Sequence, residues 1–424
     1  MSLDEYKRDM QGCSRCSSCK WVGFDQIRGA RFANNCPSIS RFNFHAYSGS
    51  GRLNMGLSVL DGRTELNDAA ADILFKCQMC NACDTACKVF RDDMEVGEVL
   101  LELRAAAVEQ GLSPIEHMAM IDWLKKEDNT VGALKEHRGD WAAGLPVKDI
   151  NTQSAEVLFH AGCQYSYNPE LRKIVRGTVK LLLQAGVDVG IAGKTESCSG
   201  GRAYEMGYRA EGESFADDML ARVKSSGATT LVAICGDCYG TFTYLYPKMG
   251  RPLPCRVVHV SELLAELVRD GTLRLEHEIP LLATYHDPCH LGRMGEPYVG
   301  EWQGDKLMRP SRLKRTGKNG VYDRPRDVLT AIPGTKLVEM VRTREFSWCC
   351  GSGGGALESN PEFADWTARQ RIEEAVSTGA EALVTSCPWC VNAFKKAVDD
   401  TGSDLEVYEL TELVLRSAGL PQDD

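Results

Sequence analysis

The chain has 424 residues, of which 43% are hydrophobic and 25% are charged, so it can bury large cores in about two to four domains. A formal net charge of −10 argues against a general nucleic-acid binder, whose contact surface would be basic. The N-terminus has no secretory signal, and no apolar run approaches the roughly 20 residues of a membrane span. We therefore expect a cytoplasmic protein, which would reach a membrane only through a partner protein.

Cysteine is the most unusual part of the composition, with 18 residues. Thiols stay reduced in the cytosol, so this many cysteines indicate metal ligation rather than disulfides. Seventeen of them fall into four groups: Cys13, Cys16, Cys19 and Cys36; Cys77, Cys80, Cys83 and Cys87; Cys163, Cys198, Cys235 and Cys238; and Cys289, Cys349, Cys350, Cys387 and Cys390. The remaining one, Cys255, is expected to be a small buried residue.

Residues 1–110 are predicted to form a small domain of helices and loops, with a strong helical pattern over 95–110. The spacing from Cys77 to Cys87 is that of a bacterial ferredoxin [4Fe–4S] run. The triplet from Cys13 to Cys19 repeats it, but its fourth cysteine, Cys36, follows only after sixteen residues. The fourth cysteine of such a run ligates the other cluster of the pair. We therefore predict two cross-ligated sets: Cys13, Cys16, Cys19 and Cys87; and Cys77, Cys80, Cys83 and Cys36.

Structural zinc is the alternative for these cysteines, because zinc also binds CxxC pairs, although it gives no reason for paired triplets. Basic residues near the two runs would tune the potential, dock an acidic partner or simply be solvated. They are Lys20, Arg28, Arg31 and Lys88.

After a connector over residues 111–154, with short helical pieces at 115–126 and 131–141, the chain repeats itself. The repeats are predicted at 155–277 and 278–424. Four segments correspond: Val157–Cys163 with Ala283–Cys289; Ser197–Gly201 with Trp348–Gly351; Leu231–Cys238 with Leu383–Cys390; and Val257–Leu264 with Val407–Val414.

Short apolar strands in each repeat alternate with amphipathic helices, such as those predicted at 169–185 and 360–377. This pattern indicates α/β units with parallel sheets and helical crossovers. Ligands of open parallel sheets lie at the carboxyl ends of the strands, where the cysteines fall. We expect two pseudo-symmetric halves with their sites near the cleft between them.

The second repeat resembles a known family. The segments that carry the resemblance are Tyr285–Arg293 (YHDPCHLGR), Tyr322–Arg326, Ile332–Gly334, Trp348–Gly355 (WCCGSGGG) and Ser386–Cys390 (SCPWC). They are similar to the cysteine-rich CCG domain of the catalytic iron–sulfur subunits of heterodisulfide reductase. The order of a ferredoxin-like part and two repeats also resembles the iron–sulfur subunits of glycolate, lactate and glycerol-3-phosphate dehydrogenases.

This resemblance implies that the five second-repeat cysteines hold a non-cubane [4Fe–4S] cluster able to meet a disulfide. Tandem Cys349 and Cys350 fit one compact site of soft ligands, and the glycine run after them would let backbone approach the sulfides. In the first repeat, Ser199 replaces the second cysteine of the pair. That leaves four cysteines, which would hold a further [4Fe–4S] cubane or form a degenerate site.

Non-cysteine candidates flank these ligands. His286, His290 and Arg293 would deliver protons or donate hydrogen bonds to a cluster, although the two histidines, like His160 in the first repeat, would equally close the end of a strand. The 59 residues between Cys289 and Cys349 include a basic insertion that would hold an anionic substrate, bind a partner or be a solvated loop. Its members are Lys306, Arg309, Arg312, Lys314, Arg315 and Lys318.

Together these features predict an iron–sulfur oxidoreductase subunit that relays electrons between a flavoprotein partner and a terminal acceptor. No segment offers a nucleotide fold for flavin or nicotinamide, so two-electron chemistry would enter through another chain. Three hypotheses remain open: a catalytic heterodisulfide-reductase-like subunit; a purely electron-transferring subunit of a 2-hydroxyacid, glycerol-3-phosphate, acyl-CoA or aryl-CoA redox complex; and a zinc-stabilised interaction protein.

Overall fold

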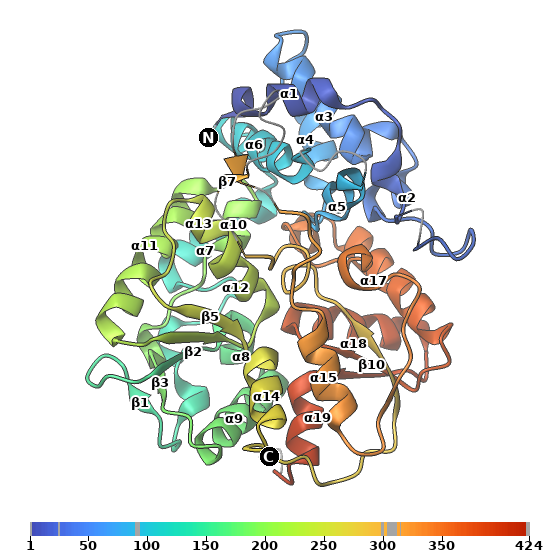
Figure 1. The fold of residues 1–424 in the computed structure, drawn as a ribbon. Coiled ribbons are helices and arrows are strands. Elements are labelled where there is room, and N and C mark those ends of the chain that lie inside the picture. The colour runs from blue at the N-terminus through green and yellow to red at the C-terminus, as the bar shows by residue number, and fades with distance from the viewer. Residues whose placement is uncertain are drawn as a thin grey trace.

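The computed structural model describes residues 2–23, 26–89, 94–297, 301–302, 312–313 and 315–420. An N-terminal helical region lies on top of two α/β repeats that stand side by side, and the described chain ends at the foot of the molecule between them (Figure 1). The architecture is thus the predicted one, a helical part followed by two units with parallel sheets. Within the described part of the chain, no helix combines the length and the apolar character that a bilayer crossing needs.

The N-terminal region consists of short helices around a hydrophobic core that includes Leu53, Phe75 and Val99 and extends to Tyr204 and Tyr244 of the first repeat. Its helices are α1 (Lys7–Gly12), α2 (Pro37–Phe42), α3 (Gly49–Leu60), α4 (Asp68–Phe75), α5 (Ala82–Lys88) and α6 (Val96–Glu109), with 3-10 turns at Leu3–Tyr6, Ser18–Lys20 and His45–Tyr47. Helix α6 confirms the helix predicted over 95–110.

The connector forms α7 (Ile115–Glu127), as predicted, whereas the second predicted piece reduces to 3-10 turns at Lys135–His137 and Asp140–Ala142. The short strand β1 (Lys148–Asp149) then pairs with β3 (Val189–Ile191) at the edge of the first sheet. The connector therefore contributes to the first repeat, and the domain limits at residues 110, 154 and 277 stay predictions.

The two repeats have the same strand order, which is the structural form of the repeat seen in the sequence. The first sheet runs β1-β3-β2-β4-β5, and the second, taken from the corresponding edge, runs β9-β6-β10-β11, so β1 is an additional edge strand of the first sheet. Every pair in these sheets is parallel. The first-repeat strands are β2 (Val157–His160), β3, β4 (Thr230–Ala233) and β5 (Arg256–His259); their counterparts are β6 (Leu282–His286), β9 (Lys336–Leu337), β10 (Ala382–Thr385) and β11 (Glu406–Glu409).

Helices cover both sheets and join the repeats. They are α8 (Gly162–Tyr167), α9 (Pro169–Gln184), α10 (Gly201–Glu205), α11 (Arg209–Ser226), α12 (Gly236–Gly240), α13 (Tyr246–Lys248), α14 (Val260–Arg269), α15 (Asp323–Ala331), α16 (Ala356–Ser359), α17 (Pro361–Val376), α18 (Pro388–Thr401) and α19 (Leu410–Ser417). A 3-10 turn at Gly193–Thr195, a π-helical turn at Thr241–Leu245, a 3-10 turn at Arg344–Phe346 and the antiparallel pair β7 (Glu301–Trp302) and β8 (Arg312–Leu313) complete the described elements.

The repeats pack through a pseudo-twofold contact, in which α14 packs on α15 and α19 packs on α9. Gly177 on α9 makes the second contact close, because a Cβ there would lie 2.6 Å from a methyl carbon of Leu415. A continuous hydrophobic core then runs from the first sheet into α15 and α19. This packing holds the carboxyl ends of the two sheets in a fixed relation.

Candidate metal centres

The outer N-terminal set consists of Cys13, Cys16, Cys19 and Cys87. These four cysteines line one cavity of about 50 Å³, together with Leu53 and Val96. Cys13 caps the end of α1 and Cys87 lies on α5, so the set joins segments that are far apart in the sequence. Four thiols around one cavity fit the donor set of an iron–sulfur cluster, and they are the four that the spacing grouped together. Cys16 is exposed, whereas no cysteine of the other sets is.

The inner N-terminal set consists of Cys36, Cys77, Cys80 and Cys83. Burial raises the pKa of the Cys83 thiol well above its usual value, and the neighbouring Cys36 and Cys77 raise it further. Burial likewise raises the pKa of Cys36, at the start of α2, to about 12. These mutual effects show that the fold brings together the four cysteines of the second predicted set. Buried thiols with raised pKa values are poor reactive cysteines, and they would ionise on binding metal.

The five second-repeat cysteines form one connected group. The Cys349 thiol interacts with those of Cys289 and Cys350, and Cys390 interacts with Cys350 and Cys387. All five are buried, with exposed fractions of 8% or less. Cys289 follows β6, the tandem pair follows a 3-10 turn, and Cys387 and Cys390 open α18.

A small cavity of about 20 Å³ lies against four of these five cysteines, those other than Cys349. Arg202 and Trp389 also line it, with the guanidinium 4.3 Å from the centroid of the indole ring. Arg202 is held there by an ion pair with Glu358 at 2.6 Å. The cavity would hold about one water molecule, so a larger molecule would have to displace these side chains.

The inner N-terminal set touches the second-repeat set at Cys80 and Cys349. A hydrogen bond from the Cys349 thiol is the main cause that lowers the pKa of Cys80 to about 5, against the effect of burial. The contact depends on the glycine run, because a Cβ on Gly353 would overlap the Gln78 carbonyl oxygen and one on Gly354 would lie 2.8 Å from Met79. We expected the glycines to let backbone approach the sulfides of a cluster. In the structure, they allow two chain segments to pack closely against each other.

The first-repeat set also comes together. Cys163 interacts with Cys198, and Cys235 with Cys238. Cys235 additionally contacts Cys387 of the second repeat, so the two sets meet between the halves. Ser199, which stands where the second repeat has Cys350, is also buried. Contacts between thiols therefore run without interruption from Cys80 to Cys235.

Charged residues from outside the cysteine motifs surround the first-repeat set. Arg138 of the connector donates to the Cys163 sulfur at 3.5 Å and pairs with Glu196 at 2.9 Å. Burial opposes protonation of His160, but Glu196 and Cys238 outweigh it and raise the pKa of this histidine.

His290 and Arg293 both lie at the second-repeat set. His290 Nδ1 is 3.3 Å from the Cys289 sulfur, and its Nε2 is 2.7 Å from Glu205 and 3.3 Å from Asp237. Burial disfavours the imidazolium, but these neighbours raise the pKa of His290 well above its usual value. Arg293 donates to the Cys80 carbonyl at 2.5 Å and to the Ser347 carbonyl at 2.8 Å, which ties the inner set to the second repeat.

His286, at the end of β6, stacks edge-on against Phe394. Burial and Arg371 lower its pKa well below the usual value, so the ring is neutral. No sequence pattern marks Arg371, Arg138 or Glu205 as neighbours of the cysteine sets, because all three lie outside the cysteine motifs themselves.

The basic residues singled out in the sequence differ in their surroundings, and two expectations are corrected. Lys88 is not solvated; it is buried and paired with Asp84 at 2.8 Å and Glu95 at 3.1 Å. Arg315 is also buried, with its guanidinium 3.4 Å from the centroid of the Tyr244 ring. Arg28 and Lys318 are exposed, as is Arg31, which pairs with Glu373. Lys306, Arg309 and Lys314 lie outside the described residues, as does the side chain of Arg312.

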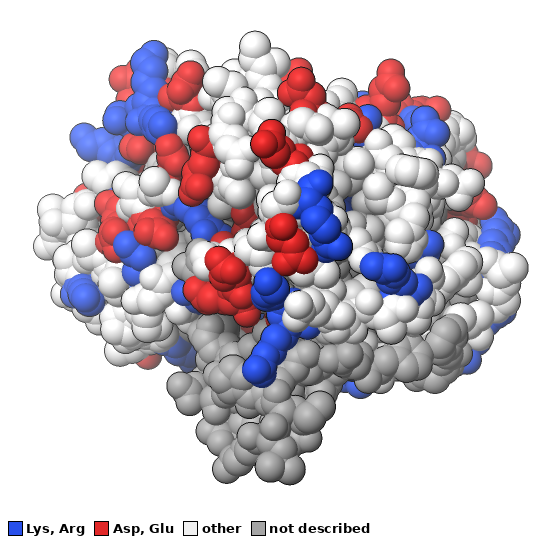
Figure 2. Space-filling view, turned by 90° about the horizontal axis from the view of Figure 1, so that it is seen from above, with Lys and Arg blue, Asp and Glu red and all other residues white. Residues whose placement is uncertain are grey.

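Cys255 is only partly buried, against expectation, and packs at the edge of the first-repeat core. Seen from above, acidic and basic side chains are interspersed over the described part of the upper face, without a field of one sign (Figure 2).

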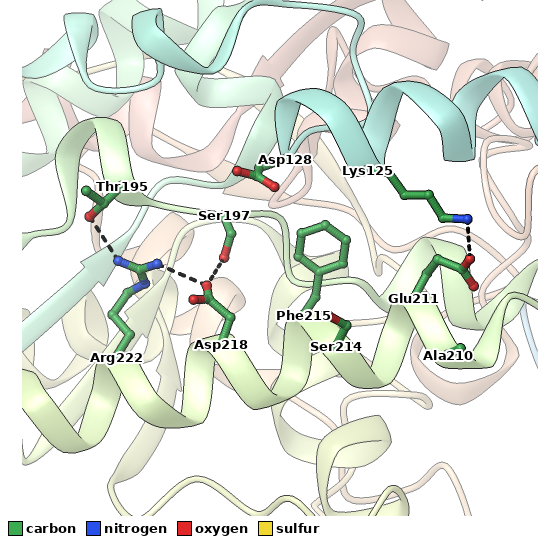
Figure 3. Close-up of a pocket in the computed structure, with 10 residues that line it drawn as sticks. All are labelled: Lys125, Asp128, Thr195, Ser197, Ala210, Glu211, Ser214, Phe215, Asp218 and Arg222. Carbon is green, nitrogen blue, oxygen red and sulfur yellow. Dashed lines mark hydrogen bonds and ion pairs between the residues drawn. The ribbon is translucent and has the colours of Figure 1, made fainter.

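A polar hollow of about 510 Å³ lies between α7 and α11, beside the loop that leads to Cys198 (Figure 3). Four of its charged groups pair with one another, Lys125 with Glu211 at 2.7 Å and Arg222 with Asp218 at 3.0 Å. The fifth, Asp128, pairs with Lys135 outside the lining at 3.7 Å. Because each of these charges already has a partner, they specify no ligand of either sign.

Comparison with known proteins agrees with this geometry. A model described as "Cysteine-rich domain" (CCG) matches residues 157–243 and 283–395, and one described as "4Fe-4S dicluster domain" matches 9–90. A dihydromethanophenazine:CoB--CoM heterodisulfide reductase subunit from Methanosarcina mazei is 30% identical over 97% of this chain and 95% of that protein. The chain belongs to this family of heterodisulfide reductase subunits. It is therefore an iron–sulfur oxidoreductase subunit, and its dicluster and CCG domains indicate iron–sulfur clusters.

Other proteins to which the chain is similar are named for different reactions. A fumarate reductase (CoM/CoB) subunit of Methanothermobacter marburgensis is 25% identical over 96% of this chain and 72% of that protein. EtfAB:quinone oxidoreductase of Syntrophomonas wolfei is 26% identical over 82% of this chain and 47% of that protein. A hypothetical protein of Helicobacter pylori shares the fold, with a TM-score of 0.56 at 10% identity over 88% of this chain and 68% of that one.

Proposed function

We propose that this subunit carries electrons between a flavoprotein partner and a disulfide or other two-electron acceptor. The outer and inner N-terminal sets would each hold a [4Fe–4S] cubane, and the five second-repeat cysteines a non-cubane [4Fe–4S] cluster. When bound, these clusters supply one-electron oxidation and reduction without any protein-derived redox group. The first-repeat set would hold a further four-thiolate cluster.

The observation that carries this proposal is the contact between Cys80 and Cys349, because it joins the N-terminal sets to the complete CCG set. Cys16 is exposed at the outer set, which is where a partner would exchange electrons. The second-repeat set is buried further along the series, between the inner set and the first-repeat set. The series thus begins at solvent and leads to an enclosed site. The similarity to a protein named EtfAB:quinone oxidoreductase supports a flavoprotein as the partner.

Reduction of a disulfide needs two electrons and two protons, and it breaks the S–S bond to give two thiols. Besides the cysteines and Arg202, the ionisable side chains beside the cavity at this set are His290 and Asp237, and His290 is hydrogen bonded to Cys289. They are therefore the residues that would hold protons near the reacting sulfurs.

A purely electron-transferring role is the second candidate, and the burial of the second-repeat set favours it. Its five cysteines are 8% exposed or less, so a disulfide would reach them only if covering side chains such as Arg202 or Trp389 moved. In that case the second-repeat set would conduct electrons onward to another protein of the complex.

The test uses anaerobically purified protein with its full complement of iron and sulfide. Chemically reduced wild type should be reoxidised by a small aliphatic disulfide, whereas Cys350→Ser should lose the non-cubane EPR signal and stay reduced. Cys255→Ser, which changes a cysteine outside every set, is the matched control and should behave as wild type.

Reoxidation of Cys350→Ser at the wild-type rate would overturn the disulfide role. Wild type that shows only cubane signals and ignores the disulfide would support the conducting role instead, and zinc without iron would refute both.

A further inference from the structure

His286 and His160 occupy equivalent places in the two repeats. Each ends the strand that leads to the first cysteine of its set. Each also meets a phenylalanine edge-on: Phe394 lies 4.7 Å from His286 and Phe242 lies 5.1 Å from His160, between ring centroids. These phenylalanines both follow the last cysteine of their CxxC motif by four residues. The two imidazoles are therefore held alike by packing.

Their Nδ1 atoms face opposite charges. In the first repeat, His160 Nδ1 lies 3.7 Å from the Glu196 carboxylate. In the second repeat, Arg371 donates its Nε hydrogen to His286 Nδ1 at 3.1 Å. A guanidinium can only donate, so His286 Nδ1 must accept and cannot carry a proton. In the neutral ring the single N–H is consequently on Nε2.

That N–H has no acceptor among the described residues, although the ring is 1% exposed. A buried donor without a partner has lost its hydrogen bond to water and has formed no other. Burying it is therefore unfavourable unless an acceptor is present at the site. Cys350 is the thiol with which the ring interacts electrostatically. Sulfur atoms of the second-repeat cluster are thus the acceptors that its surroundings offer.

We propose that Arg371 is a positioning residue that fixes the tautomer of His286, so that Nε2–H donates a hydrogen bond to the cluster of the second repeat. This inference rests on the proposed function, because it needs a cluster at that set. A hydrogen bond to cluster sulfur stabilises the more negative, reduced state and raises the reduction potential. The second-repeat cluster should therefore be easier to reduce than it would be without the bond.

Arg371 is rigidly placed for this role. It lies on α17, is completely buried, and forms an ion pair with Glu374 at 2.7 Å. It also donates to the Arg342 carbonyl at 3.0 Å and to Ser347 Oγ at 3.2 Å. With its other donors engaged in this way, the Nε–H is directed at His286. The fold thereby fixes which ring nitrogen of His286 carries the proton.

Arg342 provides a matched control. It pairs with the same Glu374 at 2.9 Å and is also buried, but its remaining side-chain hydrogen bond goes to the Asn34 carbonyl instead of His286. Loss of Arg342 therefore breaks a comparable ion pair but keeps the hydrogen bond between Arg371 and His286.

The experiment combines EPR-monitored redox titration with detection of ¹⁵N hyperfine coupling in protein labelled at histidine. In wild type, the second-repeat signal should show coupling to nitrogens of two histidines, His286 and His290, because His290 Nδ1 also lies 3.3 Å from the Cys289 sulfur. His286→Leu should remove the coupling of His286, leave that of His290, and shift the midpoint potential of that signal to a more negative value. His286→Gln, which keeps an N–H donor, should shift it less. The N-terminal signals should not change.

Arg371→Met should weaken the coupling of His286 and shift the potential in the same direction, and Arg371→Lys, which keeps a donor, should restore both. Arg342→Met should leave both unchanged. If His286→Leu leaves coupling and potential at wild-type values, or if Arg342→Met has the effect of Arg371→Met, the inference is wrong. The His286 variants decide the matter even if Arg371→Met does not fold. A wild type without any second-repeat signal would instead refute the proposed function.

Discussion

His117 is a single residue that joins the connector to the second repeat. It lies on α7, is fully buried, and its Nε2 is 2.7 Å from the Gly355 carbonyl oxygen. Burial is the main cause that lowers its pKa to about 4. The ring is therefore neutral in the folded protein at pH 7, whereas in the unfolded chain it titrates near its ordinary value of about 6.5.

This pKa difference predicts a loss of stability in mild acid. Between pH 6.5 and 4 the unfolded chain binds a proton that the folded state does not, so the stabilising contribution is complete above pH 6.5 and is lost as pH falls toward 4. From about pH 7.5 to about pH 5.5, wild type should lose about 1.4 kcal/mol more than His117→Gln does. Anaerobic denaturant titrations at the two pH values measure this difference.

The exposed His137 offers the control. His137→Gln should keep the wild-type dependence on pH, because the side chain of His137 is 55% exposed. A His117→Gln variant with the same dependence as wild type would show that His117 is not kept neutral by burial.

The grouping of the N-terminal cysteines is the part of the candidate site that could be predicted from sequence, because cluster binding would impose fixed spacings on Cys77 to Cys87 and on Cys13 to Cys19. The cross-pairing with Cys36 and Cys87 followed from the same rule. Arg371, Glu205 and Arg138 could not be predicted. Their positions depend on packing between distant segments: Arg371 and Glu205 each lie 85 residues from the histidine that they contact.

At the scale of elements, the glycine run after Cys350 joins the second repeat to the N-terminal region. Arg104 of α6 reinforces the junction, because it donates to the carbonyls of Cys77, Glu205 and Gly354, one in each of the three parts. The buried Arg104 side chain thus connects the N-terminal region with both repeats. The glycines of the run let the second repeat pack closely against the N-terminal region. The sequence indicated a glycine-rich turn here but not the segment packed against it.

Gly353→Ala tests this junction. The added Cβ would meet the backbone of Gln78, which cannot rotate away, so we expect a loss of about 1–3 kcal/mol in stability. The EPR signals of both the inner set and the second-repeat set should also change, since Cys80 and Cys349 would be pushed apart. Thermal unfolding and EPR spectra of the same anaerobic sample give both results.

Gly111→Ala is the comparison for this variant. Its Cβ would meet nothing within 4 Å, and its positive φ of 74° would cost only backbone strain. It should leave both EPR signals unaltered. Unchanged signals in Gly353→Ala as well would contradict a junction role for the run.

Elements themselves were largely predictable, because α6, α9 and α17 have the periodicity of helices and the strands of both repeats are short apolar runs before cysteines. The segment 131–141 was less so, because it forms only 3-10 turns. Strand β1 was missed, since two residues that extend a sheet edge leave no periodic pattern.

At the scale of the whole molecule, the cysteine sets form a series. It begins at the outer set, where Cys16 is exposed, and passes to the inner set where Cys19 interacts with Cys83. It continues from Cys80 to Cys349 and ends where Cys387 meets Cys235 between the two halves. The pseudo-twofold packing of α14 on α15 and α19 on α9 holds the last two sets together. Internal repetition predicted two similar halves, but not which set would adjoin the N-terminal region, because that depends on the glycine run.

These cysteines are expected to form distinct iron–sulfur sites, with cross-ligated N-terminal sets and a five-thiolate second-repeat set. EPR-monitored redox titration of wild type and single Cys→Ser variants tests this expectation most directly. Cys87→Ser should perturb the same signal as Cys16→Ser, Cys36→Ser the same signal as Cys77→Ser, and Cys350→Ser a third signal alone. A common signal perturbed by both Cys87→Ser and Cys77→Ser, or no signal changed by Cys350→Ser, would contradict this assignment of ligands.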